Sequence, residues 1–265
     1  MAIQTGNIKY RGSFKSIRQY INLHDPNTYA GEKGGANRDL ILNNPAFART
    51  RENMNEFAGC GLAVKAIRYG ILNLLPEQTD KNFTARLMRT VKEINRRDYE
   101  GIRGKRAIIF SGERPFFLSS TVLNVREDVA DMLQKQFSFE HPIGRGAATL
   151  SLTAFNIKPN LIPVGAGYYR VQNHISVISD YTYVEANRRY EPLSQLNTTS
   201  AFAYSAYTPV GTALTDEIVA SFPQGTVPGT DDSVIQCVGI EFFCKSGAAD
   251  YLPLKGSSVL IIDVF

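Results

Sequence analysis

The residue types that hold metal ions are few in this chain of 265 residues, and they lie far apart. Its three histidines are His24, His141 and His174, and none of them stands in an H-E-x-x-H or C-x-x-C context. A metal site needs several histidines, cysteines or carboxylates to converge at fixed spacing. The sequence therefore predicts no metal site and no cofactor.

The signatures of covalent and phosphate chemistry are also missing. No G-x-S-x-G elbow occurs, and no lysine follows a serine by three positions, which removes the usual Ser/Lys acyl-transfer motif. The glycine-rich stretch Gly31–Gly35 lacks the G-x-x-x-x-G-K-[ST] order that cradles phosphates. A glycosidase pair can lie far apart in a chain and leaves no local pattern, and nothing here favours one. We expect a protein that is not an enzyme.

The charge of the chain changes sign along its length. Residues 1–106 carry 19 Lys/Arg and 10 Asp/Glu, whereas residues 107–265 carry 10 and 15, giving balances of +9 and −5. Such asymmetry indicates a basic surface for an acidic partner, either the acidic half of another copy or nucleic acid. The candidate inter-subunit or polyanion contacts are Arg86, Arg89, Lys92, Arg96, Arg97, Lys105 and Arg106. The alternative is a solvated surface, because no recognition-helix, zinc-finger or RRM signature accompanies these residues.

Residues 1–44 read as an extended N-terminal arm. Short alternating segments such as 8–21 are punctuated by glycines, which is typical of brief strands and loops. An arm of this kind cannot build its own core. It packs on its own chain, or it reaches onto another subunit, where a free strand edge is a template for pairing.

Residues 45–145 read as mainly helical. Asn44-Pro45 is a helix start signal, and the run that follows has helical spacing as far as Pro76, with a break expected near Gly59–Gly61 because glycine disfavours helix. A second, strongly basic helix follows, with an apolar stripe of Phe83, Leu87, Val91 and Ile94. Residues 105–125 resemble a strand, a turn and a second apolar stretch, and residues 126–136 a short helix.

Residues 146–265 alternate between apolar and polar side chains and are divided by Gly/Pro/Asn/Asp turns. This pattern is typical of an antiparallel β-sandwich or a jelly-roll-like domain. Taken with the preceding region, it predicts an α+β fold, with an N-terminal arm and basic helices followed by this domain.

The cellular compartment follows from the cysteines and the apolar runs. The cysteines are Cys60, Cys237 and Cys244, an odd number in apolar surroundings, which favours a reducing compartment. We find no signal-peptide core and no stretch of about 18 uninterrupted apolar residues, so membrane insertion is not expected. The predicted location is the cytoplasm, or a particle assembled there.

Several short blocks resemble a family of Bacteroidota proteins that has no assigned activity. They include Asn44–Asn53 with Glu56-Phe57, the opening Gly6–Phe14 segment and the Gly31–Gly35 turn. Two further blocks lie near the C-terminus, at Gly239–Phe242 and Tyr251–Gly256. The resemblance implies an arm and helices followed by a β domain, and it transfers no site residues.

These observations favour a non-catalytic structural subunit that self-assembles into a filament, tube, shell or virion-like particle. Homo-oligomer contacts are expected through the N-terminal arm and the basic helices. The alternative function is a module that binds nucleic acid or carbohydrate on the sandwich loops. Each copy carries a basic and an acidic half, which suits head-to-tail contacts in open or ring-like assemblies.

Overall fold

The structure is a computed structural model that describes residues 2–6, 9–21, 27–32, 34–71, 82–121, 137–247 and 250–265. The chain divides into two compact units, Met1–Arg51 and Glu52–Phe265. The second unit contains both the predicted β-sandwich domain (146–265) and the part of the predicted helical region that follows Arg51. The helix predicted at 126–136 lies outside the described residues.

The first unit is a small antiparallel sheet followed by a helical turn. Its strands are β1 (Ala2–Ile3), β2 (Gly12–Phe14), β3 (Ile17–Ile21) and β4 (Thr28–Glu32), in the order β1-β4-β3-β2. Helix α1 (Arg38–Asn43) begins where the side chain of Asn37 accepts a hydrogen bond from the Leu40 amide at 2.7 Å. The short 3-10 helix η1 (Pro45–Phe47) starts at Asn44, whose side chain accepts from the Ala46 amide, so the start signal predicted at Asn44-Pro45 is confirmed.

Helix α2 (Ala48–Gly70) runs without interruption, so the break predicted near Gly59–Gly61 is wrong. The physical reason is that the small residues form a contact surface. Gly59, Cys60 and Ala63 are buried, and a Cβ added at Gly59 would lie 2.5 Å from the ring of Tyr190. The loss of helix propensity at glycine, about 1 kcal/mol, is offset by this close approach.

Helix α3 (Phe83–Arg97) buries the whole predicted stripe of Phe83, Leu87, Val91 and Ile94, which confirms that prediction. The predicted second apolar stretch is instead helix α4 (Arg114–Ser120), with Pro115 in its first turn. Phe117 of α4 is fully buried and meets Phe110 edge to face at 5.6 Å. Burial of these rings outweighs the weak local preference of so short a helix.

Antiparallel sheets dominate the second unit. The larger sheet has the order β10-β7-β13-β14, formed by Ser200–Tyr204, Tyr168–Ser179, Asp232–Ser246 and Asp250–Val264, with β11 (Thr208–Pro209) also paired to β7. The smaller has the order β12-β6-β5, formed by Leu214–Ser221, Ala147–Phe155 and Phe137–Glu140. A two-stranded ribbon pairs β8 (Tyr181–Val184) with β9 (Arg189–Pro192), and a 3-10 turn, η3, covers Pro159–Leu161.

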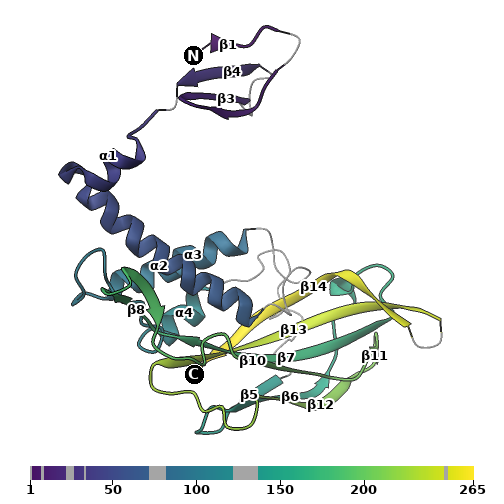
Figure 1. The fold of residues 1–265 in the computed structure, drawn as a ribbon. Helices are drawn as coiled ribbons and strands as arrows, with labels where there is room; N and C mark the ends of the chain where they lie inside the picture. Colours follow the sequence, from purple (N-terminus) through teal and green to yellow (C-terminus); the bar gives the residue numbers. More distant parts are fainter. Residues whose placement is uncertain are drawn as a thin grey trace. The chain divides into compact units, whose positions relative to one another are not determined.

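The second unit has three layers, with helices α2, α3 and α4 on one face of the larger sheet and the smaller sheet on the other (Figure 1). Helix residues such as Ile67, Leu87 and Phe117 share a core with Ile235 and Cys237 of β13. On the opposite face, Leu150 and Leu152 of β6 pack against Val171, Val238 and Phe242. The predicted α+β class with a sandwich-like domain is confirmed, and no closed barrel forms among the described strands.

Buried polar side chains tie the layers together. Asn173 of β7 is fully buried between the sheets and donates hydrogen bonds at 2.8 Å to the carbonyls of Ala148 and Ile218. It also accepts one from Gln236 at 3.0 Å. Because a buried polar group without partners is costly, this amide fixes how β6 and β12 lie over β7. No helix in the described part of the chain is long and apolar enough to span a membrane.

Candidate functional site

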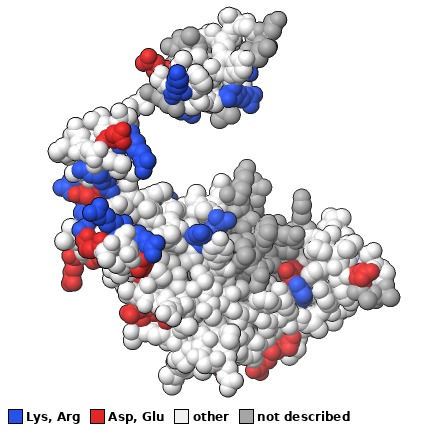
Figure 2. Space-filling model, viewed as in Figure 1, with Lys and Arg blue, Asp and Glu red and all other residues white. Residues whose placement is uncertain are grey.

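The seven basic residues predicted as partner contacts lie on helix α3 and in the connection that follows it. Five lie on α3 (Arg86, Arg89, Lys92, Arg96 and Arg97), and Lys105 and Arg106 follow in the connection to the sheets. Over α2 and α3, basic and acidic side chains are interleaved on the face seen in Figure 2. Most of the seven have an acidic neighbour in their own chain.

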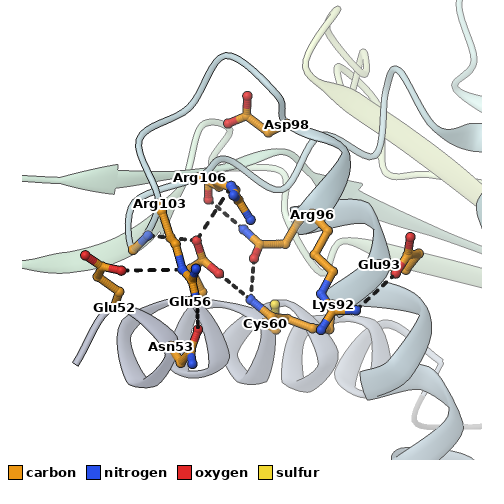
Figure 3. Close-up of polar contacts among 12 residues, drawn as sticks. Glu52, Asn53, Glu56, Cys60, Lys92, Glu93, Arg96, Asp98, Arg103 and Arg106 are labelled. Atoms are coloured by element: carbon orange, nitrogen blue, oxygen red, sulfur yellow. Dashed lines mark hydrogen bonds and ion pairs between the residues drawn. The ribbon is translucent and has the colours of Figure 1, made fainter. Parts of the chain in front are cut away.

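Lys92 and Arg106 point to one buried carboxylate, Glu56 of α2 (Figure 3). The Nζ of Lys92 lies 2.5 Å from Oε2 of Glu56, and the Nε of Arg106 lies 4.0 Å from Oε1. The backbone amide of Gly104 donates to Oε1 at 2.8 Å, and Lys92 also donates to Asn95 at 2.7 Å. Glu56 thus has a partner for each oxygen although only 2% of its side chain is exposed.

This network holds the 98–107 connection onto helices α2 and α3. Asn95, which is fully buried, donates to the carbonyl of Arg106 at 2.7 Å, and the Tyr190 hydroxyl donates to the same carbonyl at 2.9 Å. Asp98 accepts from the amides of Gly101 and Ala107. All of these contacts lie within the chain, so the network has a structural role: it fixes the 98–107 connection to the two helices.

The ionisation of the network also favours a structural role. Burial raises the pKa of Glu56, but hydrogen bonds from Lys92 and Gly104 and the charges of Lys92 and Arg106 outweigh it, so the net pKa is lowered. Burial raises the pKa of the neighbouring Cys60 thiol to about 12. A thiol that stays protonated at neutral pH is a poor nucleophile.

Three more of the seven basic residues have acidic neighbours. Arg97 pairs with Glu113 at 2.7 Å and stacks on the Phe116 ring at 3.6 Å. Arg96 approaches Glu93 at 3.6 Å on the exposed side of α3, and Lys105 pairs with Glu185. These pairs reduce the positive potential that a polyanion would meet.

Arg86 and Arg89 line a groove of about 390 Å³ between α3 and α4. Its other lining residues are Thr90, Glu93, Phe116 and Ser120. The Thr90 hydroxyl already donates to the Ser120 carbonyl at 3.1 Å, and the carboxylate of Glu93 opposes an incoming anion. The groove could accept a single anionic group, but it offers no extended basic track.

No metal-ligand cluster was found where the structure describes the chain: no three His, Cys, Asp or Glu side chains converge there. His24 lies outside those residues. His141 stacks on Phe265 at 3.7 Å, and Nε2 of His174 lies 2.7 Å from the Gly70 carbonyl oxygen. Burial lowers the pKa of His174, which keeps its ring neutral in this contact.

The Met1–Arg51 unit presents its apolar residues to solvent. The unit forms a four-stranded sheet, yet Thr28 is the one buried residue among its described side chains. Phe14 is 71% exposed and Tyr10 is 62% exposed, and both line a surface hollow of about 350 Å³ together with Arg11 and Gln19. Ile17 and Ile21 share the face of Phe14 and are exposed as well, whereas the exposed Ile3 lies on the opposite face. The Phe14 face is an apolar surface with no packing partner in its own unit.

Sequence reasoning missed one cluster of aromatic side chains at the end of the larger sheet. Tyr204, Tyr207 and Phe243 lie around Arg170 of β7, which pairs with Glu241 of β13. Tyr251 stacks on Tyr207. The signal was present in the tyrosine-rich segments 168–170 and 202–207, which lie in strand-like surroundings. The register of the strands, which brings the segments together, was not visible in the sequence.

No protein-family model, no curated protein and no solved structure matches this chain.

Proposed function

We propose that this chain is a non-catalytic structural subunit that joins further copies of itself into a filament, tube, shell or virion-like particle. The single observation that carries the proposal is the Met1–Arg51 sheet, in which Thr28 is the one buried residue among the described side chains. A sheet gains little stability from strand pairing alone and needs a covered face.

The free energy of folding favours a partner that buries one face of this sheet. Ordering each backbone residue costs about 1–2 kcal/mol, and full burial of an Ile or Phe side chain returns about 1.5–3 kcal/mol. Phe14, Ile17 and Ile21 contribute little of this while they are exposed. A partner that covers them supplies the missing stabilisation.

The partner we infer is a second copy of the same chain. Met1–Arg51 carries 8 Lys/Arg and 3 Asp/Glu, a balance of +5, whereas residues 107–265 have a balance of −5. Each copy therefore offers both a basic apolar sheet and an acidic surface. Contacts between unlike surfaces are heterologous and generate rings or open filaments.

Nucleic acid is a less well supported partner than a second copy of the chain. Lys92, Arg97 and Lys105 each pair closely with a carboxylate of their own chain, and phosphate binding would have to compete with those pairs.

The three cysteines are free, which agrees with assembly in a reducing cytoplasm.

The test compares the size of the full chain with that of a surface variant, using size-exclusion chromatography with light scattering. We expect large oligomers from the full chain. The double variant Phe14→Ser/Ile17→Ser should run as a monomer, because it removes two apolar side chains from the proposed contact. Both positions are exposed, so serines there should leave the fold undisturbed. Tyr99→Ser/Ile102→Ser is the matched control, since Tyr99 and Ile102 are 89% and 75% exposed in the other unit.

Two results would overturn the proposal. One is a full chain that remains monomeric at low and high salt. The other is an oligomer whose size is unchanged by Phe14→Ser/Ile17→Ser and by deletion of residues 1–44.

A further inference from the structure

The larger sheet has a polar and aromatic surface beyond the helices that cover it. Arg170, Gln172 and His174 alternate along β7 and therefore share one face of the sheet. The end of α2 reaches this face at His174, where the Gly70 carbonyl oxygen lies 2.7 Å from Nε2. Arg170 lies four residues further along the strand, where the aromatic cluster begins.

Three aromatic rings lie around Arg170, those of Tyr204, Tyr207 and Phe243. The Cζ of Arg170 lies 3.8 Å from the ring centre of Tyr204 on β10 and 5.3 Å from that of Tyr207. Tyr207 stacks on Tyr251 of β14, with ring centres 3.9 Å apart and planes at 1°. Tyr204 and Tyr207 remain 37% exposed. The rings form a fixed aromatic surface, held largely by strands and open to solvent.

A charge pair with directional hydrogen bonds lies in the middle of this surface. The Nε of Arg170 donates to Glu241 at 2.5 Å, and one terminal guanidinium nitrogen donates to the Tyr207 hydroxyl at 3.3 Å. Arg170 and Glu241 are directly opposite on neighbouring strands. The charges of Arg170 and Glu241 cancel. Lys245, whose Nζ lies 5.9 Å from the Tyr251 ring centre, is one further cation nearby, which is too few for a polyanion site.

Gln172 adds an unsatisfied polar group on the same face. Its side chain is fully buried, yet neither its amide nitrogen nor its amide oxygen has a hydrogen-bond partner. It is the direct strand neighbour of Tyr204 and is two residues from Arg170. A buried amide without partners is costly and rare in native proteins. Gln172 is 0% exposed, so it lies beneath the aromatic surface and is not itself a contact for a ligand.

We infer that the surface formed by Arg170, Tyr204, Tyr207 and Glu241 binds a neutral oligosaccharide. A pyranose ring has an apolar C–H face that packs on an aromatic ring, and its rim of hydroxyls pairs with planar polar side chains. The cluster offers both kinds of group on rigid strands, without net charge. The site is independent of the Met1–Arg51 unit, so each copy in an assembly would carry one.

The experiment measures binding of the full chain to cellohexaose, xylohexaose, mannohexaose, laminarihexaose and chitohexaose by isothermal titration calorimetry. We expect at least one of these sugars to bind. Tyr204→Ala and Arg170→Met should each weaken that binding about tenfold or more, the order expected for loss of one aromatic or charged hydrogen-bonding contact. Tyr99→Ala, which removes an exposed tyrosine elsewhere, should bind like the unaltered chain.

Circular dichroism and thermal unfolding of each variant identify any that has lost its fold, and Tyr207→Phe then replaces it as a milder change that removes one hydroxyl. Binding of none of the five sugars at millimolar protein would overturn the inference, and so would equal binding by the variants. A change in oligomer size with Tyr204→Ala, without an effect on sugar binding, would instead make the surface a contact between copies.

Discussion

The carboxylate of Glu56 on α2 lies 2.5 Å from Nζ of Lys92 on α3, although only 2% of the glutamate side chain is exposed. The basic pattern of α3 predicts that Lys92 lies on a surface for an external partner. In the structure it neutralises a buried charge and helps join two helices to the 98–107 connection. This relationship leads to two predictions.

Replacing Lys92 should destabilise the protein strongly. Lys92→Met leaves the buried carboxylate of Glu56 without its closest cation, and removing one member of a buried pair costs about 3 kcal/mol or more. Urea unfolding followed by circular dichroism measures the change. Arg96→Met is the control on the same helix, because its pair with Glu93 is exposed and worth less than about 1 kcal/mol. Equal effects of the two substitutions would contradict a buried pair.

Acid should weaken the fold through Glu56. Its pKa in the folded protein is lowered from the ordinary 4.5, so its contribution is complete above that value and is lost as the pH falls through the folded pKa. We expect the free energy of unfolding of the unaltered chain to fall more steeply than that of Glu56→Gln as pH drops from about 5 to about 3. Urea titrations at successive pH values test this. Parallel slopes for the two proteins would show that Glu56 does not titrate as inferred.

The parts of the fold that depend on local pattern were predictable. The stripe of Phe83, Leu87, Val91 and Ile94 repeats at helical spacing and is buried as a unit in α3. Alternation in β6 and β12 likewise indicated strands, because only one face of the smaller sheet is covered. Asn44 ahead of Pro45 marked a helix start for a reason contained in the two residues themselves.

The parts that depend on distant partners were not predictable. Glu56 and Lys92 are 36 positions apart, and Arg170 and Glu241 are 71 apart, so no window of sequence shows either pair. The helical state of α4 follows from the burial of Phe117 against Phe110 rather than from propensity. Charges counted along a chain give the net sign of each region but not which cations are paired internally, because tertiary ion pairs are assigned only by the fold.

The three cysteines should differ sharply in reactivity. Cys60 and Cys237 are fully buried, and burial raises the pKa of each thiol, that of Cys60 to about 12. Cys244 is partly exposed on β13. Ellman's reagent should therefore modify one thiol per native chain and three after denaturation in urea. In Cys244→Ser the native reaction should disappear, whereas rapid reaction of that variant would contradict the buried packing of α2 or β13.

Two glycines on α2 should respond in opposite ways to the same substitution. A Cβ at Gly59 would lie 2.5 Å from the Tyr190 ring, whereas one at Gly61 would meet nothing closer than 3.8 Å. Because the buried ring cannot move aside, Gly59→Ala should destabilise the fold by about 1–3 kcal/mol.

Gly61→Ala is the matched control, since alanine gains up to about 1 kcal/mol over glycine in a helix and has room here. Thermal unfolding of both variants should show a lower midpoint for Gly59→Ala and an equal or higher one for Gly61→Ala. A stabilising Gly59→Ala would mean that α2 does not press against the β8-β9 ribbon at this position.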